Sequence, residues 1–164
     1  MRRLPVLLLA LLVFAVPAFA ASSMSVPSKL SSVLPKVRSR SGVAVRLPSR
    51  VPVDAGTPRV YGAIEQVSKG RYHLSLGYGR GCHESTACFL AAFFGRRDAG
   101  LTLKRNVSLA RGITGRFRGI SCGASCSPAE VQWKQGGVAY AIQFKGSKSR
   151  LIALANSAIR GGAR

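Results

Sequence analysis

The stretch Arg71-Tyr72-His73-Leu74-Ser75-Leu76-Gly77-Tyr78 decides the fold class of this chain. Its apolar and aromatic side chains stand at every second position, which is the period of a β-strand with one buried face. Residues 59–67 ahead of it form a partner segment, and Ser68-Lys69-Gly70 between the two is a turn sequence. The sequence therefore predicts an antiparallel β-hairpin over residues 59–78.

A second hairpin is predicted closer to the C-terminus. Val131 and Trp133 precede a Gln135-Gly136-Gly137 turn, and apolar side chains then alternate again from 138 to 144. Strand character also recurs over residues 88–94, 101–104 and 113–118, and residues 43–47 form either a first short strand or an extended lead-in.

Beyond Gly146 the apolar period changes to that of a helix. Ser147 is the expected N-cap and Gly161 the expected stop. The apolar residues at helical spacing are Leu151, Leu154, Ala155, Ala158 and Ile159. The sequence predicts one α+β domain over residues 43–160, an antiparallel β-meander of six or seven strands with a C-terminal amphipathic helix packed on it, followed by a tail at 161–164.

The first twenty residues have the composition of a secretory signal. Arg2 and Arg3 precede an apolar run, and Pro17 stands ahead of a small-x-small site at Ala18-Phe19-Ala20. We expect cleavage after residue 20 and a periplasmic or secreted protein, with an uncleaved N-terminal anchor as the alternative. No later apolar run is long enough to predict a transmembrane helix.

Residues 21–42 are predicted to be a flexible, basic linker. The segment is rich in Ser, contains Pro27 and Pro35, and has no apolar period. The alternative is a short amphipathic helix around Val26 to Val37, against which the two prolines argue. Such a composition buries too little apolar surface to offset the entropy cost of ordering.

Charge is the strongest compositional signal of the chain. It contains 25 Lys and Arg against 5 Asp and Glu; without the signal the net charge is +18, since 23 basic and 5 acidic side chains remain. Charge of this size predicts attraction to anionic polymers and envelope surfaces. The alternative is that the arginine content reflects only the amino-acid usage of the source.

Four cysteines bracket two short loops. Cys82 and Cys88 enclose one, Cys122 and Cys126 the other. In a simple meander the two loops fall at opposite ends of the sheet, which favours the disulfides Cys82–Cys88 and Cys122–Cys126 over cross-pairing. The spacings are wider than those of zinc knuckles and no C-x-x-C is present, so we expect neither a metal nor another cofactor.

No catalytic set is predicted. His73 lies in a strand and His83 in a cysteine loop, and neither has a nucleophile and an orienting group at useful spacing. The five carboxylates are scattered, and the glycine-rich residues 77–81 lead into a cysteine loop where a phosphate-binding motif needs a helix. We therefore expect a protein without enzymatic activity.

Basic residues are the better candidates for function. Arg71, Lys104, Arg116 and Arg118 stand opposite the apolar side of their strands, and Arg80 lies beside a cysteine loop. If the strands are neighbours, these residues form a positive sheet face that binds an anionic envelope component or a protein partner. Tyr72, Tyr78, Trp133 and Tyr140 alternate inward, so few aromatics remain for base stacking and no dedicated nucleic-acid motif is predicted.

An alternative function is a carrier or sensor of an apolar ligand in a groove between sheet and helix. The residues expected to line that groove are Leu74, Leu76, Phe117, Trp133, Tyr140, Ile142 and Phe144.

The C-terminal half also resembles a group of uncharacterised exported bacterial domains. The resemblance is carried by Cys122-Gly123-Ala124-Ser125-Cys126, by Val131-Gln132-Trp133 with Gly136-Gly137 and Tyr140, and by Leu154-Ala155-Asn156-Ser157. It implies a cell-envelope setting and a sheet-plus-helix fold, without an activity or catalytic residues.

Overall fold

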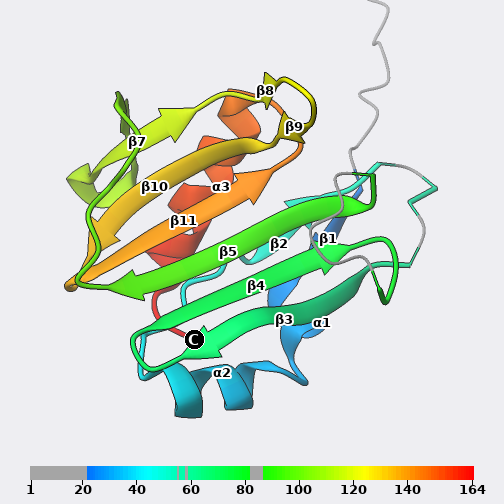
Figure 1. Ribbon diagram of the computed structural model, residues 1–164, viewed down its shortest axis with the longest axis horizontal. Coiled ribbons are helices and arrows are strands. Elements are labelled where there is room, and N and C mark those ends of the chain that lie inside the picture. Colours follow the sequence, from blue (N-terminus) through cyan, green and yellow to red (C-terminus); the bar gives the residue numbers. More distant parts are fainter. Residues whose placement is uncertain (1–21, 55, 58, 82–86) are drawn as a thin grey trace, which may run out of the picture.

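The chain folds around one antiparallel β-sheet with a helix packed against it, which confirms the predicted α+β class (Figure 1). The computed structural model describes residues 22–54, 56–57, 59–81 and 87–164, so the predicted signal at 1–20 lies outside the described residues. The sheet contains β3 (Tyr61–Ser68), β4 (Arg71–Gly77), β5 (Phe89–Arg97), β6 (Arg105–Ser108), β7 (Thr114–Arg118), β10 (Ala129–Gln135) and β11 (Val138–Phe144), and the helix is α3 (Lys148–Gly161).

Both predicted hairpins are present. β3 pairs with β4 through a turn in which Gly70 has a φ of 80°, and β10 pairs with β11 through Gly136 and Gly137, whose φ values are 59° and 75°. Residues other than glycine rarely adopt a positive φ, so glycine at these positions allows the chain to reverse direction within a short turn.

The strand order corrects the predicted meander. It reads β3-β4-β5-β11-β10-β7-β6, so two meanders lie side by side and the chain leaves β5 for the far edge of the sheet. Residues 98–104, which make this connection, were expected to include a strand at 101–104; the edge strand β6 begins only at Arg105. Thr102 and Leu103 instead donate their backbone N–H groups to Gln132 Oε1, at 2.9 and 3.3 Å.

The apolar face of the sheet is covered by helices. Leu74, Phe93, Ile142 and Val131 face one another across β4, β5, β11 and β10 and have no exposed surface. α3 contacts β10 and β11 from this side, and its five predicted apolar residues are all buried. We call the opposite side, which faces the viewer in Figure 1, the outer face.

The boundaries of α3 agree closely with the sequence. Ser147 caps its N-terminus and accepts a hydrogen bond from the Arg150 N–H at 3.3 Å. The helix ends one residue later than expected, because Gly161 is its last residue and Gly162 carries the positive φ. The predicted tail is tied to the domain, since the Arg164 N–H donates to the Val45 carbonyl at 2.8 Å.

The predicted linker at 21–42 is wrong for its described residues. It forms β1 (Ser23–Ser25), α1 (Val26–Leu30) and α2 (Leu34–Ser41), and β1 pairs with β2 (Arg50–Pro52). Apolar residues at helical spacing enter the core, namely Val26, Leu30, Leu34 and Val37. The two prolines do not break these helices, because each stands in a first turn, where its missing N–H has no helical partner to lose.

Residues 43–47 are the extended lead-in that was one of the two expectations. They belong to no strand, yet Val43, Val45 and Leu47 are buried. α1 and α2 contact β3, and α2 also contacts β4, so the N-terminal segment covers the part of the sheet that α3 does not reach.

The described residues that flank the first cysteine loop lie at the same end of the sheet as the Cys122–Cys126 loop, not at the opposite end as expected. β4 and β7 run in the same direction in the observed order, so the loops that follow them emerge together. Cys122 and Cys126 form the predicted disulfide and close the small hairpin of β8 (Ser121–Cys122) and β9 (Cys126–Ser127). Cys88 is also disulfide-bonded, and Cys82 lies outside the described residues.

Candidate functional site

Cations gather at the end of the sheet opposite the cysteine loops. We call this the basic end; it comprises the β3–β4 turn, the end of β5 and the β10–β11 turn. Backbone hydrogen bonds join the three: the Arg97 N–H donates to the Gly70 carbonyl at 2.8 Å, and the Asp98 N–H to the Gly137 carbonyl at 3.2 Å. The C-terminus of α2 braces them, since the Ser41 carbonyl accepts from the Gly70 N–H at 2.8 Å.

A hollow of about 370 Å³ at the basic end is lined by cations. Lys69, Arg71, Arg96 and Arg97 are all exposed there, and Asp98 is the one carboxylate among its lining residues. Arg71 and Arg96 are direct partners across β4 and β5. Like charges in directly opposed positions destabilise a sheet, so this pair opposes folding.

A second hollow, of about 380 Å³, adjoins the first and shares Arg97 and Asp98 with it. Arg46 and the Gly136-Gly137 turn line it. Nε and Nη1 of Arg46 are buried and have no hydrogen-bond partner among the described residues. Leaving buried N–H groups of a cation without acceptors costs free energy, so an acceptor that reached Nε and Nη1 of Arg46 would be bound favourably.

Two tyrosines surround Arg46. Its guanidinium lies 5.7 Å from the centre of the Tyr140 ring, and its backbone N–H donates to the Tyr72 hydroxyl at 3.2 Å. Burial raises the pKa of both tyrosines, with Arg46 opposing the shift in each case. Both hydroxyls therefore stay protonated at neutral pH and serve as neutral hydrogen-bonding groups.

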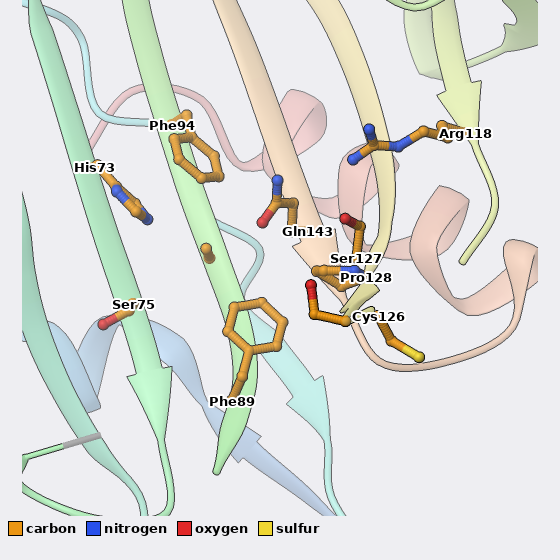
Figure 2. A pocket seen from close by; sticks show the side chains of 11 residues that line it. His73, Ser75, Phe89, Phe94, Arg118, Cys126, Ser127, Pro128 and Gln143 are labelled. Atoms are coloured by element: carbon orange, nitrogen blue, oxygen red, sulfur yellow. The ribbon is translucent and has the colours of Figure 1, made fainter. Parts of the chain in front are cut away.

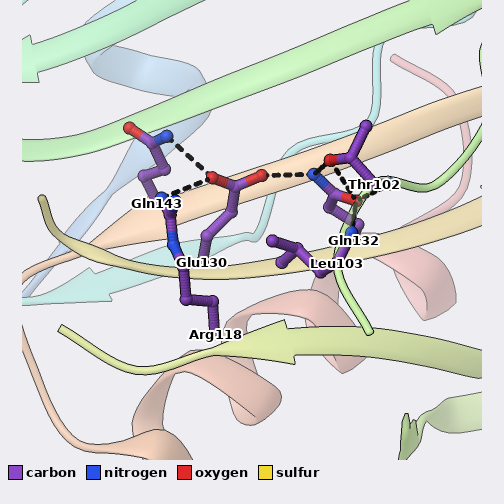
Figure 3. A network of polar contacts seen from close by, with 6 residues as sticks. All are labelled: Thr102, Leu103, Arg118, Glu130, Gln132 and Gln143. Atoms are coloured by element: carbon purple, nitrogen blue, oxygen red, sulfur yellow. Dashed lines mark hydrogen bonds and ion pairs between the residues drawn. The ribbon is translucent and has the colours of Figure 1, made fainter. Parts of the chain in front are cut away.

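A polar network occupies the outer face between β7 and β11 (Figure 3). The buried carboxylate of Glu130 accepts from Gln143 Nε2 at 3.0 Å, from Gln132 Nε2 at 2.5 Å and from Arg118 at 3.2 Å. Gln132 in turn holds the crossing residues through Thr102 and Leu103. These hydrogen bonds hold the connection between β5 and β6 against the sheet, and the Glu130 carboxylate balances the charge of Arg118.

A pocket of about 430 Å³ lies on the outer face toward the cysteine end (Figure 2). His73 and Ser75 of β4, Phe94 of β5 and Gln143 of β11 contribute to it, and the chain at 125–128 forms its wall. The rings of His73 and Phe94 stack with centres 4.1 Å apart.

The five predicted basic residues do not form one surface. Arg71 lies at the basic end on β4, whereas Arg116 and Arg118 lie on β7, four strands beyond β4 in the observed order. Arg116 donates to the Lys104 carbonyl at 2.9 Å and to Asn106, and Arg118 pairs with Glu130. Arg80 stands 5.4 Å from the Tyr61 ring near the end of β3. The condition that these strands be neighbours is not met.

Sequence reasoning did not place together the residues that do gather. Lys69 and the Arg96-Arg97 pair each stand beside a turn in the sequence, but only the β4–β5 pairing brings them together. Phe89 was missed for another reason: the register shifts between Leu76 and Gly77, so that Phe89 and Ala92 both line the outer pocket. A bulge of this kind redirects a side chain, and strict alternation cannot anticipate it.

No family model, curated protein or solved structure matches this chain. The resemblance to exported sheet-plus-helix domains therefore stays a prediction. Within the described ranges, no helix is long and apolar enough to cross a membrane, and no three His, Cys, Asp or Glu residues are grouped to hold a metal ion.

Proposed function

We propose that this chain is an exported binding domain without enzymatic activity, and that it holds an anionic component of the cell envelope at its basic end. The signal-like residues 1–20 support export. The Cys122–Cys126 disulfide agrees with this, because disulfides persist in oxidising compartments outside the cytoplasm.

The observation that carries the proposal is the opposed pair Arg71 and Arg96. Packing gains nothing from two exposed guanidinium groups in this position, and their mutual repulsion lowers stability. With Lys69 and Arg97 beside them, they form a concave cationic surface of the shape and charge that a phosphate or carboxylate group fits. In the adjoining hollow, Arg46 adds a guanidinium whose Nε and Nη1 have no acceptor among the described residues.

The space between sheet and helix does not offer the alternative site. The seven side chains expected to line an apolar groove there are at most 6% exposed and belong to the core. An apolar ligand there would have to displace the helices that cover these side chains, which disfavours the apolar-carrier function.

Binding across a salt series tests the proposal. The oxidised protein as exported is titrated with lipopolysaccharide, teichoic acid, acidic lipid vesicles, DNA and an acidic protein. We expect one envelope polymer to bind at near-physiological salt, with the others lost as ions screen the charges. Equal, salt-labile binding to every polyanion, or preference for the acidic protein, would contradict the proposal.

Paired variants locate the site. Arg71→Gln with Arg96→Gln should weaken binding of the selected polymer about tenfold, because two ion pairs worth up to about 1 kcal/mol each are removed. The same variant should be at least as thermally stable as the parent, since the opposed charges are gone. Arg105→Gln with Arg150→Gln, two exposed cations away from the basic end, removes the same charge and should bind almost as the parent does.

A further inference from the structure

The pocket on the outer face is distinct from the basic end in both place and chemistry. It lies toward the cysteine end of the sheet, and its volume of about 430 Å³ is within the usual range for small-ligand sites. Among the described residues that line it, Arg118 is the one Lys or Arg, and its guanidinium already pairs with Glu130. Net positive charge therefore does not explain this pocket.

Aromatic rings supply part of the pocket lining. His73 and Phe94 stack at 4.1 Å with an angle of 23° between their planes, and Figure 2 shows them side by side on neighbouring strands. Phe89 lies further along β5 and joins them because of the bulge. Aromatic faces attract C–H groups that carry partial positive charge, and such groups line one side of a sugar ring.

Polar groups that can both donate and accept surround the rings. Gln143 donates its amide N–H to Glu130, and its amide oxygen is an acceptor for a ligand. The Arg118 side chain is 42% exposed and has more N–H groups than its contact with Glu130 uses. Ser127 adds a hydroxyl. Vicinal hydroxyls of a sugar need donors and acceptors together, as found here.

The wall of the pocket is held before any ligand arrives. Residues 125–128 contribute it, and within them Cys126 is tied to Cys122 and Pro128 has a fixed φ. A wall ordered in advance lowers the entropy cost of binding. None of the described residues that line the pocket is Leu, Ile, Val or Met, which disfavours an acyl chain.

We propose that this pocket binds one pyranose ring of a glycan, with the ring packed against Phe94 and Phe89 and its hydroxyls hydrogen-bonded to Gln143 and Arg118. This goes beyond the proposed function, because it concerns other residues and does not depend on the charge of the basic end. The two sites together would let the domain recognise both a sugar and an anionic group.

Nuclear magnetic resonance titration tests the inference. The oxidised protein as exported is mixed in turn with maltotriose, chitotriose and a galacturonate trisaccharide, and with dodecanoate as the apolar competitor. At least one trisaccharide should shift the amide signals of residues lining the pocket. Shifts by none of the three, shifts confined to other surfaces, or occupation of the pocket by dodecanoate alone would overturn it.

Variants separate this site from the basic end. Phe94→Ala should weaken the trisaccharide about tenfold, whereas Phe94→Tyr keeps the ring and should retain binding. Arg71→Gln with Arg96→Gln should bind the trisaccharide as the parent does while losing the envelope polymer. If Phe94→Ala fails to fold, the titration of the parent protein still decides the matter. Equal trisaccharide affinity in a folded Phe94→Ala protein would refute the assigned surface.

Discussion

The two ends of the sheet are built in different ways. At the basic end, two tight turns and the end of β5 are joined by backbone hydrogen bonds and braced by the C-terminus of α2. At the cysteine end, the chain emerges in longer connections, one of which is closed by the Cys122–Cys126 disulfide. The short turns are held by backbone hydrogen bonds, and their side chains carry exposed charge. The longer connection after β7 is closed by a disulfide, and its residues 125–128 form the wall of the outer pocket.

The difference is also one of electrostatics. Exposed guanidinium groups stand opposite each other at the basic end, whereas the cation nearest the outer pocket, Arg118, is matched by Glu130. The two places therefore differ in how their cations are balanced: Arg118 has a carboxylate partner, and Arg71 faces another cation across the strand pair.

The support that α2 gives to the basic end can be weakened by a substitution in the buried face of this helix. Val37 is fully buried, and Val37→Ala removes methyl groups and leaves a cavity, so we expect a loss of about 2–3 kcal/mol in the free energy of unfolding. Chemical denaturation measures this loss, and hydrogen exchange should show faster opening at Gly70 and Arg97. An unchanged midpoint would mean that the N-terminal segment is not part of the cooperative fold.

The cysteine end can be loosened by Cys122→Ser with Cys126→Ser. A bridge across so short a loop stabilises by about 2 kcal/mol in the chain-entropy account. We expect lower thermal stability, weaker binding of any ligand in the outer pocket, and intact polyanion binding at the basic end. Loss of polyanion binding in a still-folded variant would show that the two ends are not independent.

A smaller effect is expected from Tyr72→Phe at the basic end. The hydroxyl accepts from the Arg46 N–H, so its removal should cost about 1 kcal/mol at neutral pH. Burial raises the pKa of Tyr72 above its ordinary value of 10.0, so the unfolded chain ionises first as pH increases. The parent should therefore lose stability above about pH 10 from this group, and the variant should not. Denaturation at pH 7 and pH 11 should show the gap narrowing; a constant gap would contradict this account.

Local patterns sufficed for the elements of the sheet and for α3. Each of the signals is local: the alternation around Leu74 and Ile142, the glycines in the turns, and the Ser147 cap. Because each acts over only a few residues, a single sequence is enough to recognise it. The same reasoning failed at 21–42, where Ser and Pro suggested disorder although Val26, Leu30, Leu34 and Val37 had helical spacing. The burial that stabilises these short helices comes from β3 and β4, which are distant in the sequence.

The sequence by itself determined the fold class, the two hairpins, the closing helix and the excess of positive charge. Only the tertiary structure decided the strand order, and with it which cations stand together and where the cysteine loops lie. β11 pairs with β5 although the two strands are far apart in the sequence, and the three helices cover different parts of one face of the resulting sheet. Arg71 meets Arg96, and Phe89 joins Phe94, through pairing register and a bulge, which depend on contacts between strands and not on the residues of either strand alone.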